Sequence, residues 1–197
     1  SSGRSYQIPA HELPSARTQG EPLTGRLNPP DGVAFVQVVA GSDEEHVLLC
    51  SSHGYGFIAR LGDLHTKNRN GKAAMSLPEH ASVLEPVRVP RIETDRIAVL
   101  SRKGRLLIFS ASELPVLNKG KGNKLIQISS HELASGEDDV LMAIVLGEGE
   151  GVRVSAGKRF LSLFGNDLDS YVFARAKRGT LLPRGYQHPD RIEASAP

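Results

Sequence analysis

The sequence has one cysteine, Cys50, and no long apolar segment among its 197 residues. A single cysteine cannot form an internal disulfide, which is typical of proteins in a reducing cytoplasm. The longest apolar run, Val140–Leu146, has the length of a β-strand, whereas a membrane-spanning helix needs about 20 apolar residues. The sequence also lacks the pattern of a signal peptide. We therefore expect a cytoplasmic protein in which Cys50 is a small buried side chain rather than a nucleophile.

Motifs that carry catalysis are also missing. His-Glu pairs occur at 11–12 and 131–132, but neither has the second histidine four residues later that a zinc protease needs. The glycine-rich run 147–151 carries two glutamates, so its charge is wrong for phosphate and a hairpin turn is the better interpretation. Neither a Walker A motif nor a G-x-S-x-G serine motif is present. We therefore expect no catalytic residues, no metal and no cofactor in this chain.

Helical periodicity is nearly absent, and only residues 130–135, before Gly136, could form one helical turn. Instead, one unit occurs four times. Each unit has a leading glycine and a later corner leucine that follows an acidic residue. The glycines are at positions 3, 54, 104 and 157, and the leucines at positions 13, 64, 114 and 168. A period near 50 residues with strand-like content indicates propeller blades or a β-solenoid.

Apolar runs between turn signals predict about four short strands per unit, joined by hairpins. The predicted strands are 35–39, 47–50, 56–60, 86–89, 97–100, 105–109, 125–128, 141–145, 152–154 and 160–163. We therefore predict one all-β domain over 1–197, with a partial blade at 1–32, blades at about 33–83, 84–134 and 135–190, and a tail at 191–197. The four corner leucines are expected in equivalent buried positions. The chain opens midway through a unit, so we expect it to be part of a longer array.

The net charge is only +2, but the charges are unevenly distributed. We call the four segments that follow the corner leucines the basic loops; they are residues 14–27, 65–77, 115–128 and 169–182. These loops hold eleven basic and two acidic residues, whereas the rest of the chain holds 13 basic and 20 acidic ones. Equivalent loops of a blade array share one rim. The repeat therefore predicts a basic rim on an acidic body, which is the electrostatic signature of a polyanion-binding protein.

The composition of the basic loops favours the backbone of duplex DNA. Only Tyr171 and Phe173 provide aromatic rings there, whereas single-strand binders use several rings to stack bases. Loop glycines let a backbone approach phosphates closely, and nothing predicts a helix for the major groove. We expect sequence-independent, salt-sensitive binding. The candidate DNA-binding residues are Arg17, Lys67, Arg69, Lys72, Lys119, Lys121, Lys124, Lys177 and Arg178.

Two other interpretations remain open. The basic rim of an interaction propeller could bind an acidic protein partner, which salt-titrated duplex binding would distinguish. A sugar-acting propeller enzyme would need paired carboxylates near the blade centre. The only repeated acids are those before the corner leucines, at positions 12, 63, 113 and 167. Their recurrence at every corner favours a role in turns, where carboxylates accept backbone N–H groups.

The runs at 13–25, 54–73, 114–128 and 177–185 resemble the C-terminal domains of the A subunits of bacterial topoisomerase IV (ParC) and gyrase. The resemblance covers essentially the whole chain, and the run K-G-K-G-N-K in the third segment is its most specific part. The gyrase box Q-R-R-G-G-K-G is absent; 69–72 and 119–122 are its nearest counterparts. The resemblance is therefore closer to topoisomerase IV than to gyrase.

This resemblance implies a β-pinwheel, in which propeller-like blades of four antiparallel strands exchange a strand with their neighbours; this chain would hold about three full blades and a partial one. It implies a non-catalytic part of an ATP-dependent type IIA topoisomerase, presenting the transported duplex for decatenation and relaxation in chromosome segregation. The holoenzyme would contain the A-subunit homodimer together with the B subunit, while Mg²⁺ and ATP would act elsewhere in it. A nucleoid-associated location in a bacterial cytoplasm is implied, as is contact with a condensin-type chromosome protein through Arg159 and Arg184.

Overall fold

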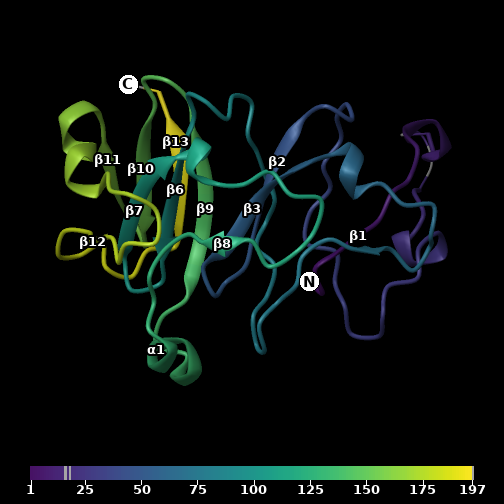
Figure 1. The fold of residues 1–197 in the computed structure, drawn as a ribbon, viewed down its shortest axis with the longest axis horizontal. Coiled ribbons are helices and arrows are strands. Elements are labelled where there is room, and N and C mark those ends of the chain that lie inside the picture. Colours follow the sequence, from purple (N-terminus) through teal and green to yellow (C-terminus); the bar gives the residue numbers. More distant parts are fainter. Residues whose placement is uncertain (16, 18, 197) are drawn as a thin grey trace.

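The computed structural model describes residues 1–15, 17 and 19–196. Each of the three larger sheets contains one β-hairpin (Figure 1). The strands of these hairpins are β2 (His46–Cys50) with β3 (Tyr55–Arg60), β6 (Arg96–Ser101) with β7 (Arg105–Ser110), and β10 (Gly151–Ala156) with β11 (Arg159–Leu163). All pairings between the named strands are antiparallel.

The outer strands of each sheet come from a later part of the chain than its hairpin. They are β4 (Lys72–Ala73), β5 (Val87–Arg88), β8 (Asn123–Lys124), β9 (Val140–Leu146), β12 (Thr180–Leu181) and β13 (Arg191–Ser195). The first full sheet has the order β5-β2-β3-β8, the next β9-β6-β7-β12, and the last β13-β10-β11. Near the N-terminus, β1 (Arg4–Ser5) pairs with β4. The chain is therefore an all-β pinwheel whose repeats exchange strands, as predicted.

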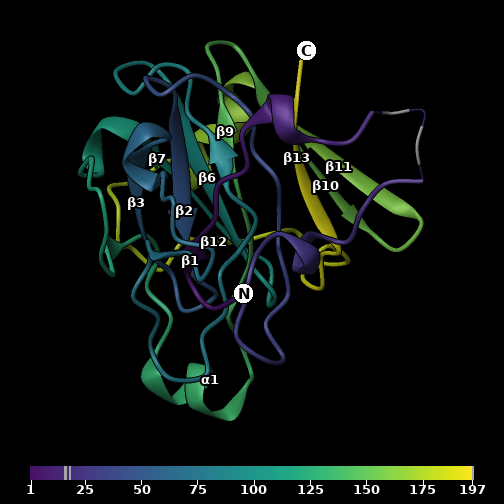
Figure 2. The ribbon, with the colours of Figure 1, turned by 90° about the vertical axis from the view of Figure 1, so that its right-hand side faces the viewer.

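The two kinds of outer strand lie at opposite edges of the sheets. At one edge, β9 lies next to both β5 and β13, and these three strands form the hub. At the other edge, β12, β8 and the β1–β4 pair follow one another along the longest axis of the molecule (Figure 1). Seen along that axis, β2, β3, β6 and β7 lie on one side and β10, β11 and β13 on the other (Figure 2), so the row of sheets is curved.

Burial on both faces explains why the central strands are apolar throughout. Ile97 and Val99 of β6 belong to the core between the first two full sheets, whereas Ala98 and Leu100 belong to the core between the second and third. Successive side chains of a strand point to opposite faces, so a sheet packed on both sides needs a continuous apolar run. Cys50 is fully buried in the first of these cores, as expected.

Helical structure is confined to short turns. The helix α1 (Ser130–Ser135) has a capping box formed by Ser129 and Glu132 and ends at Gly136, in agreement with the prediction. The remaining helical segments are 3₁₀ turns at Ala10–Glu12, Leu23–Gly25, Gly62–Leu64, Ala111–Glu113 and Gly165–Tyr171. No helix among the described residues is long and apolar enough to cross a membrane.

The corner leucines are not all equivalent. Leu114 and Leu168 are buried, with 5% and 2% of their surface exposed, and Leu64 is half-buried against the core of the first sheet. Leu13 is 51% exposed, so the expectation of four equivalent buried corners was wrong. Leu114 and Leu168 each pack in a core between two sheets, whereas Leu13 belongs to neither of these cores.

Three strand predictions and the predicted tail differ from the structure. Residues 35–39 form no strand: each hub strand pairs with the first hairpin strand of the preceding repeat, and no described residues supply that partner here. Of residues 86–89, only Val87 and Arg88 form a strand, β5. Residues 125–128 are not a strand. The N–H of Leu125 donates to the carbonyl of Gly54 and that of Gln127 to the carbonyl of Lys177, so the segment does not pair with a single strand. The predicted tail at 191–197 was wrong for 191–195, which form β13 with Ile192 buried.

The glycine repeat holds structurally in three of its four positions. Gly3, Gly54 and Gly104 have φ between +74° and +76°, and each lies against a later segment of the chain. Gly157 instead occupies a two-residue turn, since Ala156 pairs directly with Arg159, and a Cβ on it would meet open space. The last hairpin therefore has a tighter turn than the repeat predicted.

Candidate nucleic-acid interface

Hydrogen bonds join the basic loops into one continuous edge. The N–H of Asn28, directly after the first basic loop, donates to Arg69 in the second (2.8 Å). The N–H of Ser76 donates to Gly120 in the third (2.9 Å), and that of Gln127 donates to Lys177 in the fourth (2.8 Å). The end of each loop is thus attached to the next loop. The four basic loops are therefore connected in sequence order along one edge of the sheets.

A glycine in each of the last three basic loops lies against a strand of the preceding repeat, which is β1, β3 or β7. Gly122 has φ of +75°, and a Cβ on it would lie 2.2 Å from the carbonyl oxygen of Gly56. Gly71 and Gly179 have φ of +72° and +75° and approach Ser5 and Leu106 in the same way. The strand that follows each glycine is β4, β8 or β12. The basic residues therefore lie where the chain crosses to the preceding blade.

Each crossing places a cation beside the strand pair. In the β3–β8 pair, Tyr55 is opposite Lys124. In the β1–β4 and β7–β12 pairs, Arg4 of β1 and Arg105 of β7 are opposite an alanine and a leucine. Arg4 donates from Nε to the carbonyl of Asn70 (2.9 Å) and from its terminal nitrogen to that of Gly71 (2.8 Å). These two arginines were missed in the sequence because they lie outside the basic loops; both directly follow a leading glycine.

The third basic loop brings its three predicted residues together. Lys119 and Lys121 are exposed, and Lys124 is half-buried in β8. The ammonium of Lys121 lies 3.8 Å from the centre of the Tyr55 ring, and that of Lys124 lies 5.6 Å from it. Lys124 also donates to the side-chain oxygen of Gln127 (3.2 Å). Two of its three cations therefore lie at one aromatic ring.

In the second basic loop, the three predicted residues differ. Lys67 is exposed. Arg69 donates from Nε to the carbonyl of Arg26 (2.7 Å) and so ties the first two loops together. The ammonium of Lys72 is held in place by the fold, because it donates to the carbonyl of Asp63 (2.6 Å) in the preceding turn. Arg69 and Lys72 therefore hold the edge together as well as charging it.

Carboxylates neutralise part of the rim. Arg178 pairs with Glu132 of α1 (3.0 Å). The pKa of Glu132 is lowered mainly by the hydrogen bond from the Ser129 hydroxyl, next by that from the Ser129 N–H, and less by the charge of Arg178. Arg26 in the first loop is 2.8 Å from Glu21, and this contact lowers the pKa of Glu21. The remaining predicted residues of these loops, Arg17 and Lys177, are exposed.

The two predicted partner contacts lie together outside the basic loops. Arg159 begins β11 and Arg184 lies in the loop before β13, and both are exposed. A terminal nitrogen of Arg159 lies 2.9 Å from the position that a Cβ on Gly185 would take. The structure thus brings these two arginines from separate segments to one place beside the last hairpin.

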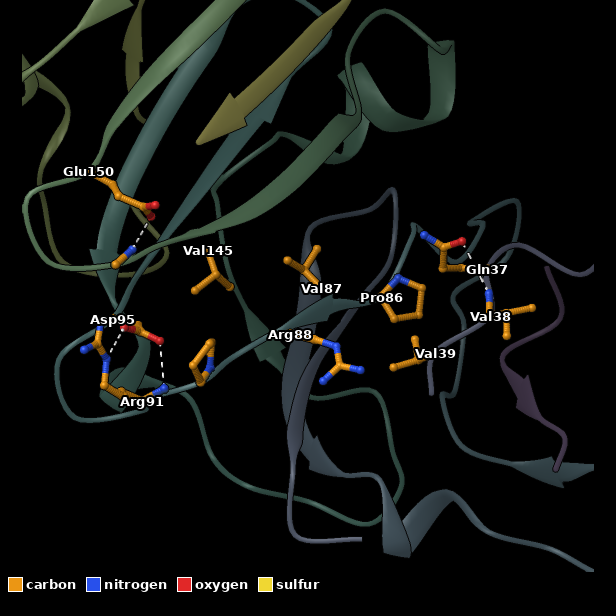
Figure 3. A pocket seen from close by; sticks show the side chains of 12 residues that line it. Gln37, Val38, Val39, Pro86, Val87, Arg88, Arg91, Asp95, Val145 and Glu150 are labelled. Carbon is orange, nitrogen blue, oxygen red and sulfur yellow. Dashed lines mark hydrogen bonds and ion pairs between the residues drawn. The ribbon is translucent and has the colours of Figure 1, made fainter. Parts of the chain in front are cut away.

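A cavity of about 520 Å³ lies beside the hub (Figure 3). Of its carboxylates, Asp95 accepts the N–H of Arg91 (2.8 Å) and Glu150 accepts the N–H of Gly147 (2.7 Å). None of the four corner acids lines it. Within the described residues, no group of three or more histidine, cysteine or acidic side chains could hold a metal ion. The geometry therefore gives no support to a sugar-acting enzyme.

Comparisons with known proteins agree with this architecture. The family described as DNA gyrase C-terminal domain, beta-propeller, matches residues 1–40, 45–89 and 95–145. The A subunit of DNA topoisomerase 4 from Pseudomonas aeruginosa is 47% identical over 197 residues, and that from Escherichia coli K12 is 44% identical. Each match covers the whole chain and 26% of the relative, so the chain spans about a quarter of the length of these proteins.

Solved structures show the same fold. The structure of the E. coli ParC C-terminal domain matches with a TM-score of 0.91 and 43% identity, covering 100% of this chain and 79% of that one. The structure of a DNA gyrase A C-terminal domain matches with a TM-score of 0.70 and 16% identity, covering 99% and 63% of the two chains. At that lower identity the likeness concerns the fold alone.

Proposed function

Because this chain belongs to the gyrase A/ParC family of C-terminal β-pinwheel domains, we propose that it binds duplex DNA along its basic loops without reading the base sequence. The observation that carries the proposal is the continuous edge formed by these loops. Its cations contact phosphates, which every sequence presents alike. The six-residue α1 is the only α-helix among the described residues, and it is too short to read the major groove.

The proposed role follows from the relatives' place in their enzyme. The chain would act as a non-catalytic domain of a topoisomerase IV A subunit, in a holoenzyme built from two A subunits together with the B subunits. It would hold the transported duplex for ATP-dependent decatenation and relaxation in the nucleoid of a bacterial cytoplasm. The basic edge supports this role. A duplex that contacts several basic loops through its phosphates would follow the curvature of the row of sheets.

Salt-titrated binding tests the proposal. Replacing Lys119, Lys121 and Lys124 by Ala should weaken binding to a duplex and lower the slope of log affinity against log salt by up to about 3, since each phosphate contact contributes about 0.9. The same loss is expected for unrelated duplex sequences. In the full enzyme, decatenation should slow while DNA-independent ATP hydrolysis is unchanged.

A matched control removes three cations from the last sheet. Arg153, Lys158 and Arg191 lie in β10, the following turn and β13, outside the basic loops. Replacing them by Ala changes the net charge equally but should leave the salt slope near that of the parent. An equal loss of affinity in both variants, or no duplex binding by the parent, would exclude the basic edge as the DNA site. If the parent binds no DNA but captures an acidic protein, the interaction propeller is supported instead.

A condensin-type chromosome protein is the second proposed partner, at Arg159 and Arg184. Their proximity beside β11, outside the basic loops, supports a separate surface. Replacing both by Ala should reduce co-purification of that partner with the topoisomerase while leaving duplex affinity unchanged. A loss of DNA affinity alone would assign these arginines to the duplex.

A further inference from the structure

Tyr55 lies where two lysines of the third basic loop converge. It begins β3, is half-buried, and pairs across the strands with Lys124 of β8. Gly122 lets the loop come close to Gly56 and thereby brings Lys121 over the ring. Both ammonium groups lie within the range of about 6 Å in which a cation is attracted to an aromatic face.

The ring differs from other partners of the rim cations in one physical respect. Glu132 and Glu21 hold Arg178 and Arg26 by opposite charge, so each pair contributes little net potential to the rim. A tyrosine ring is neutral and attracts a cation through its quadrupole. Tyr55 therefore holds two ammonium groups without cancelling their charge, and an ammonium has three donors, so N–H groups turned from the ring are available to a phosphate.

The neighbouring repeats place their cation differently. Arg4 and Arg105 occupy the position of Tyr55, and their guanidinium groups bond to carbonyls of the adjoining loop. In the middle repeat the aromatic residue takes the arginine's position and the exchanged strand supplies the cation. The third basic loop also places Lys121 over the same ring, so two cations of this repeat share one aromatic side chain.

We infer that Tyr55 is a positioning residue, which holds Lys121 and Lys124 as a two-cation contact for a DNA phosphate. The inference rests on the proposed DNA binding. Free lysine side chains lose rotamer freedom when they bind, and a residue that restricts them beforehand reduces that loss. The ring and its two lysines thus form a prearranged contact at the middle of the basic edge.

Ring substitution gives the first test. Tyr55→Phe should bind a random-sequence duplex as the parent does, whereas Tyr55→Leu should bind about two- to fivefold more weakly, because exposed cation–π contacts are worth about 0.5–1 kcal/mol. Incorporating trifluorophenylalanine at position 55 keeps the shape of Phe but weakens the negative face, so it should behave like Tyr55→Leu even if that variant folds poorly. In a Lys121→Ala/Lys124→Ala background, none of these changes should alter affinity further.

Nuclear magnetic resonance separates this inference from the proposed function. Without DNA, the ε-methylene protons of Lys121 should show an upfield ring-current shift in the parent and in Tyr55→Phe, and lose it in Tyr55→Leu. Absence of that shift in the parent overturns the inference whether or not DNA binds. Unchanged or tighter duplex binding by Tyr55→Leu overturns it as well, as does an equal loss of affinity in the Lys121→Ala/Lys124→Ala background. A parent that shows the shift but binds no duplex refutes the DNA proposal and, with it, the phosphate contact.

Discussion

The carbonyl oxygen of Gly56 lies 2.2 Å from the position that a Cβ on Gly122 would occupy. This contact joins β3 to the loop that leads into β8 of the next repeat. Only glycine fits, because the space is closed and φ is +75°. The exchange of strands between these repeats therefore depends on a residue without a side chain.

Replacing Gly122 by Ala should destabilise the domain by more than the about 1–2 kcal/mol that a left-handed backbone costs an alanine. Gly20→Ala is the matched control: its φ is +76°, but a Cβ would meet open space, so strain acts alone. Urea unfolding measures both. Equal losses of unfolding free energy in the two variants would show that the backbone around Gly56 moves to accommodate the added methyl group at no cost.

Replacing Lys67 or Lys72 should distinguish a residue that contributes only charge from one that also contributes stability. Lys67→Ala should lower the salt slope by about 0.9 without changing the melting temperature, since Lys67 is exposed. Lys72→Ala should lower stability by about 1–2 kcal/mol, because the half-buried ammonium loses its bond to the carbonyl of Asp63. Parallel thermal melts and salt titrations distinguish them, and interchangeable behaviour would contradict the assignment.

The corner leucines should differ in what they contribute to stability. Leu114→Ala should cost about 2–5 kcal/mol, as for other buried leucines. Leu13→Ala should cost less than about 1 kcal/mol, since half of its surface is already in contact with water. Denaturant unfolding of the two variants provides the comparison. Similar values would mean that Leu13 is packed in solution.

The capping box of α1 should make stability depend on pH. Hydrogen bonds from Ser129 lower the pKa of Glu132 in the folded state below its ordinary 4.5. The ionised form therefore stabilises the fold above pH 4.5, and this contribution is lost as the pH falls through the lowered pKa. The parent should be more stable than Glu132→Gln near pH 7 and equal to it at low pH. Urea unfolding over a pH series tests this, with Glu148→Gln in the exposed turn before β10 as the control; a difference that persists at low pH would show that charge is not its source.

Cys50 should be chemically inert in the folded protein. Complete burial raises the pKa of its thiol to about 12, so almost no thiolate forms at pH 8. A disulfide reagent should label it only at the rate of unfolding, and fully in denaturant. Rapid labelling of the native protein would place the thiol near the surface.

The order of the strands along the chain was largely predictable, because it depends on local patterns. Continuous apolar runs at β2, β6 and β9 and the glycines between them indicate strands and turns without knowledge of their neighbours. The same repeat placed the basic loops in equivalent positions, since equivalent segments of a repeated unit fold alike. The all-β fold and the candidate rim could therefore be predicted.

Pairing between distant segments was decided only by the tertiary structure. Residues 35–39 have the alternation of a strand but find no partner among the described residues, whereas the weakly apolar 191–195 become β13 because β10 offers them a ladder. The partners of the cations are equally non-local: Lys121 lies over Tyr55, Lys72 bonds to Asp63, and Arg178 pairs with Glu132. The sequence determined which residues are basic and where they recur. The exchange of strands decided which of them keep their charge at the surface, because a side chain's partner depends on contacts between repeats that local patterns do not encode.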